Sequence, residues 1–143
     1  MSDEIFHAAA IEAQVEAVAA FEYMSDGLRQ RDWALGSLER KALAGGLFEG
    51  TSAFDGKPTF VRIHADRERL LIDYDVGRAP ERLLRVNSAR IVPGPLVGRD
   101  AGSCVIALTK WRTPGESDTD WRRARLTFST EIFIVKGRLE LGF

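Results

Sequence analysis

The sequence has 143 residues, of which 45% are hydrophobic and 29% are charged, and its formal net charge is −1. These values are typical of a single folded domain covering residues 1–143, and they indicate neither a disordered nor a membrane-embedded chain. Because nucleic-acid-binding domains usually carry a basic patch or stripe, the balanced charge argues against nucleic acid as a partner.

The N-terminal third is predicted to be helical. Residues 3–24 are alanine-rich and contain neither Pro nor Gly, and alanine is the strongest helix former. Their apolar residues follow the three- and four-residue spacing of one helix face. Gly27 either kinks this helix or lies within it, and a second helix is expected over residues 32–43. Gly45-Gly46 is expected to end that helix, because glycine readily adopts a left-handed backbone.

From residue 47 onward, apolar residues alternate with polar ones, which is the period of half-buried strands. The predicted strands span residues 47–54, 59–65, 70–76, 83–92, 103–112, 123–134 and 139–143. Asp55-Gly56 is a turn signal and predicts that the first two strands form a hairpin. Pro93 must end its strand, because proline has no backbone N–H for the ladder, and Lys136-Gly137 is expected to form the last turn.

This order predicts an α+β domain with N-terminal helices packed on a curved, mostly antiparallel sheet of about six or seven strands. Strands that are joined by short turns pair antiparallel, since a parallel pair needs a long crossover connection. The apolar face of the helices must cover one face of the sheet, which gives a two-layer domain. Because Gly and Pro at strand bends favour curvature, we expect a cavity between the helices and the sheet.

The single cysteine, Cys104, excludes an intrachain disulfide. It lies in an apolar run and is expected to be a small buried hydrophobic residue, because no known motif ties His7 or His64 to it as a base. The N-terminus lacks the basic and apolar regions of a signal peptide, and no apolar run is long enough to span a bilayer. A cytoplasmic location is therefore the expectation.

The segments 21–24 (Phe-Glu-Tyr-Met) and 31–35 (Arg-Asp-Trp-Ala-Leu) resemble the long first helix and the Asp-Trp start of the second helix in the nuclear transport factor 2-like superfamily. The C-terminal strand, turn and strand are similar as well. The resemblance implies a cone-shaped, cystatin-like fold, a pocket between helices and sheet, and a homodimer formed through the sheet. Members of this superfamily usually place another helix between the early strands, whereas residues 47–92 are predicted here to be strands.

A lipocalin-like barrel with N-terminal helices is the alternative architecture. Residues 46–50 (Gly-Leu-Phe-Glu-Gly) resemble the early Gly-x-Trp strand of that group, with Phe48 in place of tryptophan. About forty helical residues in front of the barrel would be unusual for it. Neither fold by itself selects a function.

His64, Asp73 and Asp75 are the candidate catalytic residues. Histidine is the natural acid–base group near neutral pH, and the two aspartates lie on one face of the next predicted strand. If the two strands form a hairpin, the histidine and a carboxylate become cross-strand neighbours that could move a proton. The alternative is an ordinary polar outer face with exposed ion pairs.

The candidate ligand-binding residues are Tyr23, Asp32, Trp33 and Arg125. Asp32 and Trp33 could line the mouth of a pocket; otherwise Asp32 caps the second helix and Trp33 packs in the core. Tyr23 could offer its hydroxyl to a ligand. Arg125 shares a predicted strand face with Glu131, and such a pair could bind an anionic substrate.

No phosphate-binding glycine loop, paired Cys-x-x-Cys or His-x-x-x-His motif is present, so no metal and no cofactor are expected. Two functions remain open, and the sequence does not decide whether the chain is an enzyme. The first is a pocket protein for a small apolar molecule, with isomerase or dehydratase activity as an option. The second is a non-catalytic dimeric binding or assembly subunit.

Overall fold

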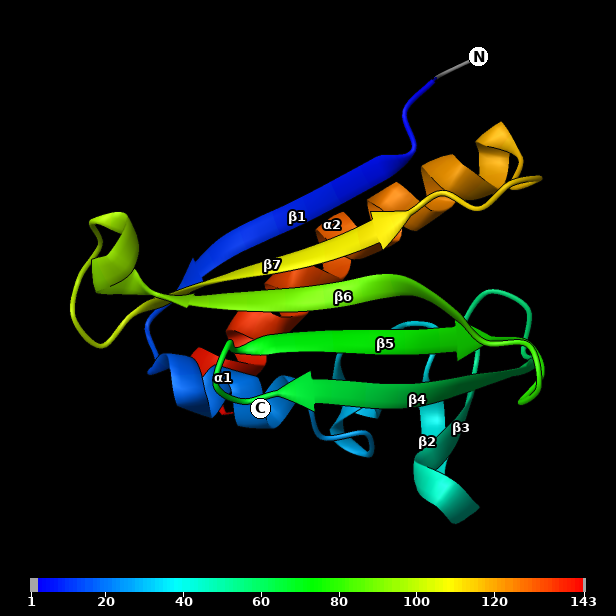
Figure 1. Ribbon diagram of the computed structural model, residues 1–143, viewed down its shortest axis with the longest axis horizontal. Helices are drawn as coiled ribbons and strands as arrows, with labels where there is room; N and C mark the ends of the chain where they lie inside the picture. Colours follow the sequence, from blue (N-terminus) through cyan, green and yellow to red (C-terminus); the bar gives the residue numbers. More distant parts are fainter. Residues whose placement is uncertain (1–2, 143) are drawn as a thin grey trace.

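The structure is a computed structural model that describes residues 3–142, and it shows a sheet with one long helix laid across it (Figure 1). The strands are β1 Phe6–Ala13, β2 Leu38–Ala42, β3 Leu47–Thr51, β4 Pro58–Asp66, β5 Leu71–Gly77, β6 Leu84–Pro93 and β7 Cys104–Trp111. The helices are α1 Ala17–Met24 and α2 Asp118–Leu141, with short 3-10 turns η1 Arg29–Asp32, η2 Ala44–Gly46 and η3 Gly94–Val97.

All neighbouring strands of the described sheet are antiparallel, in the order β1-β7-β6-β5-β4-β3-β2. The register shifts between Leu38 and Lys41 of β2 and between Tyr74 and Val76 of β5, and such irregularities bend a sheet. The expected α+β fold with a curved antiparallel sheet is therefore confirmed. The sheet is open, with β1 and β2 as its edges, so the lipocalin-like barrel is wrong.

The strands predicted between residues 47 and 111 are confirmed, and residues 47–92 contain no further α-helix. The Asp55-Gly56 turn joins β3 to β4, and Gly56 has the left-handed φ of 69° that the turn requires. Gly45 is also left-handed, at φ 72°, but it turns a β2–β3 hairpin instead of ending a helix.

The long N-terminal helix is wrong over its first half, because residues 6–13 form the edge strand β1. This strand pairs with β7 in an unbroken register from Phe6 opposite Trp111 to Ala13 opposite Cys104. The pairing satisfies the backbone groups of β7 along that edge and overrides the helix propensity of alanine. Of the predicted helix over residues 3–24, only α1, from Ala17 to Met24, is helical.

The second predicted helix, residues 32–43, is also wrong. The chain makes the short turn η1, passes Trp33 and enters β2 at Leu38. Asp32 is the last residue of η1 and caps no helix. The two N-terminal helices on which the resemblance to the nuclear transport factor 2-like superfamily depends are thus not both present.

The largest correction concerns the C-terminus, where α2 replaces two predicted strands. Ser117 caps the helix, because its hydroxyl accepts a hydrogen bond from the Asp120 backbone N–H at 3.0 Å. Asp118 and Asp120 lie in the first turn and suit the positive end of the helix dipole. Phe143, the end of the predicted closing strand, lies outside the described residues.

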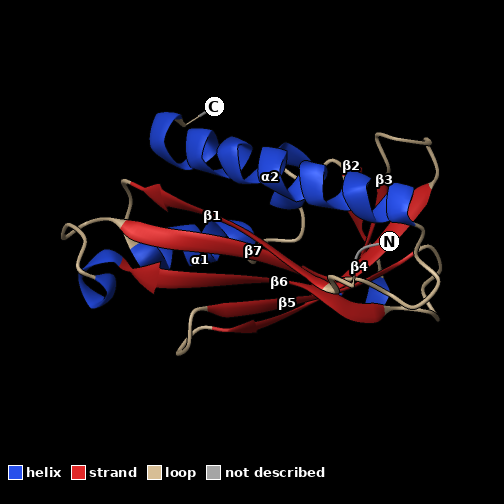
Figure 2. Ribbon diagram, turned by 90° about the horizontal axis from the view of Figure 1, so that it is seen from above, coloured by secondary structure: helices blue, strands red, loops and turns tan. Residues whose placement is uncertain are grey.

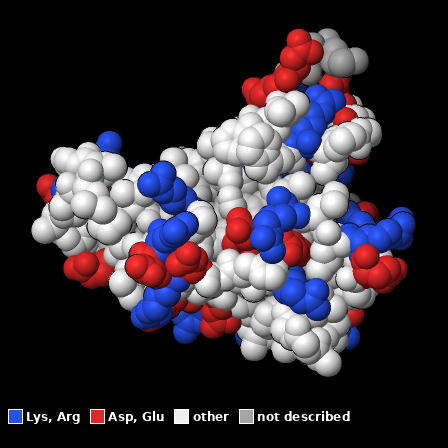
Figure 3. Space-filling model, viewed as in Figure 1, with Lys and Arg blue, Asp and Glu red and all other residues white. Residues whose placement is uncertain are grey.

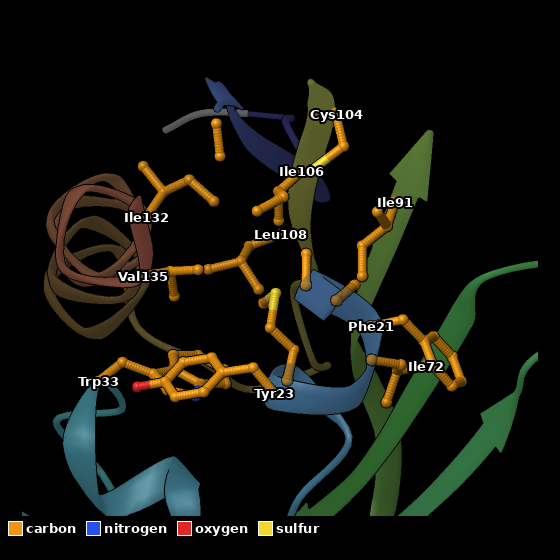
Figure 4. Packing of buried hydrophobic residues seen from close by; sticks show 14 of the residues in the cluster. Phe21, Tyr23, Trp33, Ile72, Ile91, Cys104, Ile106, Leu108, Ile132 and Val135 are labelled. Atoms are coloured by element: carbon orange, nitrogen blue, oxygen red, sulfur yellow. The ribbon is translucent and has the colours of Figure 1, made fainter. Parts of the chain in front are cut away.

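The helix α2 lies across one face of the sheet (Figure 2). Buried residues of α2 and of the strands belong to one hydrophobic core. Ile132 and Val135 point from α2 toward Ile106 and Leu108 of β7 (Figure 4). The buried alanines Ala9, Ala13, Ala17 and Ala20 keep the N-terminal elements close to this cluster. Cys104 is fully buried in the same core, as the sequence predicted, and burial raises the pKa of its thiol.

Candidate functional site

A cavity of about 660 Å³ lies between α2 and the concave face of the sheet. This volume is within the range of sites that hold small organic ligands. Apolar side chains dominate the walls, among them Trp33, Tyr74, Leu108 and Phe128. The shape follows from the fold, because a curved sheet cannot touch a straight helix along its whole length.

One stripe of α2 forms the helical wall of the cavity. It consists of residues at three- and four-residue spacing: Asp120, Arg123, Ala124, Thr127, Phe128 and Glu131. Trp121 lies beside this stripe, buried under the Lys110 and Arg112 side chains, whose cations stand 5.8 Å and 6.0 Å from its ring. The stripe becomes more polar and more exposed toward the N-terminus of the helix.

Glu131 is the buried carboxyl group of the cavity wall, with 4% of its surface exposed. Its Oε2 accepts a hydrogen bond from the Leu35 backbone N–H at 2.7 Å. Among residues 3–142, no cation pairs with it, and its Oε1 has no hydrogen-bond partner. Burial therefore dominates and raises the pKa of Glu131 to about 8, although the Leu35 hydrogen bond opposes the rise.

Three other residues of the cavity wall keep a buried polar atom without a partner in the described chain. These atoms are Nε1 of Trp33, Oε1 of Gln30 and Oδ1 of Asn87. Tyr74 differs, because its hydroxyl donates to the Met24 carbonyl at 2.7 Å. Since buried polar groups usually have partners, the three free atoms mark this region as one that a polar ligand group or water could complete.

Arg40 of β2 lies just behind this wall and is 3% exposed. Its guanidinium donates to the hydroxyl of Ser37, which lines the cavity. No carboxylate in the described residues pairs with it, and burial lowers its pKa to about 10.

The catalytic candidates His64, Asp73 and Asp75 lie on the opposite face of the sheet, and none of them lines the cavity. His64 stands opposite Asp73 in the β4–β5 register, and its Nε2 contacts Asp75 Oδ2 at 2.8 Å. Arg85 binds the same carboxylate at 2.8 Å and is the main cause of the lowered pKa of Asp75. Acidic and basic side chains are interspersed over this outer face (Figure 3).

None of these three residues therefore points into the cavity. Strand residues alternate between faces, and Val61 and Tyr74 take the inner positions on β4 and β5. A catalytic role on the outer face stays a prediction.

Of the predicted ligand-binding residues, only Trp33 lines the cavity. Tyr23 is buried in the same core cluster as Trp33 (Figure 4). Its hydroxyl has no partner in the described chain, and burial raises its pKa to about 12. The Asp32 carbonyl accepts from Arg138. Arg125 approaches Glu4 at 3.8 Å, and because residues 123–134 are helical it does not share a face with Glu131.

Sequence reasoning named Glu131 only as a partner of Arg125, and it did not single out Asn87 or Gln30. The available signal for Glu131 was helical spacing, which relates it to Ala124, Thr127 and Phe128. No motif marks Asn87 or Gln30.

Within residues 3–142, no three metal-binding side chains gather in one place, and no helix combines the length and apolar character that crossing a membrane requires.

A long C-terminal helix held by a curved antiparallel sheet, with a cavity between them, defines a helix-grip-like α+β protein. No protein-family model and no curated relative matches the sequence. Solved structures do match. XoxI from Bacillus cereus has a TM-score of 0.75 and 13% identity, over 98% of this chain and 99% of that chain.

Two further solved structures match with lower TM-scores. The Zhui aromatase/cyclase from a Streptomyces species has a TM-score of 0.62 and 16% identity, over 94% of this chain and 92% of that one. A START superfamily protein from Mycobacterium smegmatis has a TM-score of 0.65 and 13% identity, over 98% of this chain and 100% of that one. At such low identity the likeness shows the fold alone. The nuclear transport factor 2-like assignment is not confirmed.

Proposed function

We propose that this protein binds a small, mostly apolar molecule in the cavity between α2 and the sheet. The observation that carries the proposal is the cavity itself, which combines a volume of about 660 Å³ and apolar walls with the buried polar groups of Glu131, Trp33 and Asn87. Few polar groups in an apolar pocket are typical of sites that orient a ligand. The likeness to an aromatase/cyclase and to a START superfamily protein supports the same function.

Isomerase or dehydratase chemistry is the finer form of this proposal. Both reactions need a group that gives or takes a proton at the bound substrate. Glu131 is the buried acid of the cavity wall, and its raised pKa of about 8 keeps it protonated at neutral pH while leaving it able to ionise. The outer-face residues His64 and Asp75 would require a separate site across the sheet.

The test is saturable binding of an apolar fluorescent probe, N-phenyl-1-naphthylamine, to the wild type and to two variants. Ala124→Trp places an indole in the cavity, so we expect the probe to be excluded while the protein stays folded. Arg122→Trp is the matched control, because its exposed side chain does not line the cavity and binding should persist. Equal binding by all three proteins would contradict the proposal.

A homodimer is the second candidate, and one observation favours it. Phe6 and Trp111, at one end of the β1–β7 pair, are both exposed, and their rings lie tilted against each other with centroids 4.6 Å apart. An aromatic pair beside a free sheet edge is suited to pairing with a second copy. Sedimentation should show a dimer that dissociates in Trp111→Arg, and a wild-type monomer at all concentrations would count against it.

A further inference from the structure

We propose that the neutral carboxylic acid of Glu131 donates a hydrogen bond from Oε1 to a carbonyl oxygen of the bound ligand, so that the cavity selects apolar ketones, aldehydes or esters. This inference rests on the proposed function and names the ligand class of the same site. It also makes Glu131 the group that would polarise such a carbonyl.

The geometry assigns the two oxygens of Glu131 different tasks. Oε2 accepts the Leu35 N–H at 2.7 Å, which fixes the carboxyl group and leaves Oε1 as the oxygen that carries the proton. Oε1 has no partner among the described residues, and the side chain lines the cavity. A hydroxyl donor that opens onto a largely apolar cavity needs an acceptor, and a carbonyl oxygen of the ligand would supply it.

Burial and the Leu35 hydrogen bond are the causes that act on the pKa of Glu131, and no charged side chain is among them. The other charged side chains of the cavity wall pair elsewhere: Lys110 with Glu116, Arg123 with Asp120, and Arg78 with Asp55. Tyr74 faces Glu131 from β5, but its hydroxyl is committed to Met24 and its pKa is raised by burial. Arg40 of β2 bonds to Ser37.

From β1, His7 contacts Ser129 on another side of α2, and burial lowers the pKa of this histidine. It therefore stays neutral above neutral pH. Titration of Glu131 can thus be followed from pH 7 upward without a contribution from His7.

An amine ligand is the rival class, because a cation could pair with ionised Glu131. The two classes respond to pH in opposite directions. A carbonyl ligand needs the protonated acid and loses affinity as the pH rises through the pKa of Glu131. An amine needs the carboxylate, so its affinity would rise over the same interval until the amine itself loses its proton.

The experiment compares 2-acetylnaphthalene with 2-isopropylnaphthalene, which has nearly the same shape but no carbonyl, by competition with the fluorescent probe. At about pH 7 we expect the ketone to bind the wild type about tenfold more tightly than the hydrocarbon. Near pH 9.5 this preference should fall to about one, because the carboxylate has no proton to donate. 2-(1-Aminoethyl)naphthalene serves as the amine probe.

Two variants separate the hydrogen bond from mere packing. Glu131→Gln can accept from Leu35 with its oxygen and donate with its amide N–H, so the ketone preference should persist and become independent of pH. Glu131→Met fills similar space without a donor, so the preference should disappear at both pH values.

The outcomes distinguish the two proposals. If none of the probes binds the wild type, the proposed function fails. If the ketone and the hydrocarbon bind equally at both pH values, or if the amine binds best and strengthens with pH, only the assignment of Glu131 as a donor to a carbonyl is overturned.

Discussion

The Leu35 backbone N–H donates to Oε2 of Glu131 at 2.7 Å and joins the segment before β2 to the middle of α2, 96 positions later in the chain. Leu35 follows Trp33 and Ala34, which are both buried in the core. This hydrogen bond therefore holds the Glu131 carboxyl group of the cavity wall against the buried segment that precedes β2. A change at Glu131 should affect both the stability of the fold and the chemistry of the cavity.

The free energy of unfolding should carry a pH dependence from Glu131. In the unfolded chain the group ionises near its usual pKa of 4.5, whereas the folded protein holds the proton up to about 8. Between these values the unfolded chain binds fewer protons, so stability falls as the pH rises, by up to about 1.4 kcal/mol per pH unit. Above pH 8 the loss is complete.

Denaturant unfolding of the wild type and Glu131→Gln from pH 5 to pH 9 measures this contribution. The variant keeps an acceptor for Leu35 and does not ionise, so its stability relative to the wild type should increase with pH by a few kcal/mol in all. If the stabilities of the wild type and Glu131→Gln change in parallel over this pH interval, the pKa of Glu131 is not raised by folding.

Tyr74→Phe, which removes the Tyr74 hydroxyl, should lower the free energy of unfolding by roughly 1–3 kcal/mol, because the buried Met24 carbonyl would lose its donor. Tyr23→Phe is the matched control. The Tyr23 hydroxyl is buried and has no partner in the described residues, so its removal should be neutral or stabilising. Thermal unfolding of both variants checks the difference, and equal losses would be inconsistent with the assigned hydrogen bonds.

Ser117→Ala should lower the free energy of unfolding by about 1 kcal/mol, since the N-cap of α2 would lose its acceptor for the Asp120 N–H. Thr119→Ala, at an exposed position two residues later, should change the free energy of unfolding by less than about 0.5 kcal/mol. Chemical denaturation of the pair measures the cap, and a Ser117 variant as stable as its control would argue against it.

His64→Ala should leave ligand affinity in the cavity unchanged within about twofold, because His64 lies on the outer face of the sheet, where it contacts Asp75, and does not line the cavity. The probe titration described above is the measurement. A large loss of affinity or of any catalytic turnover in this variant would instead support the sequence-based catalytic prediction for the outer face.

The sequence predicted the middle of the fold well because local signals there agree with the tertiary structure. Strict alternation in β4 and β5 and the Asp55-Gly56 turn specify strands and their pairing without distant partners. The expected histidine–carboxylate neighbours on β4 and β5 follow from the same alternation. Which face of that hairpin turns inward depends on α2, which lies far away in sequence.

Both ends of the chain were mispredicted for reasons of tertiary context. Residues 6–13 have helical composition, yet pairing with β7 makes them a strand. Residues 124–134 also alternate in polarity, and this pattern concealed the helical spacing that leads from Ala124 to Glu131. The Ser117 cap and the acidic first turn were the local signals for the helix. The raised pKa of Glu131 could not be read from sequence, because its burial depends on Leu35 and the sheet.

The most direct test of ligand binding in the cavity is an amide NMR titration of isotope-labelled wild-type protein with 2-acetylnaphthalene. We expect saturable shift changes at the cavity positions Leu108, Ala124 and Glu131 and at Leu35, whose N–H donates to Glu131. Little change is expected at His64 and Asp73 on the outer face. Shifts that are absent at saturating probe, or that concentrate on the outer face, would contradict the account.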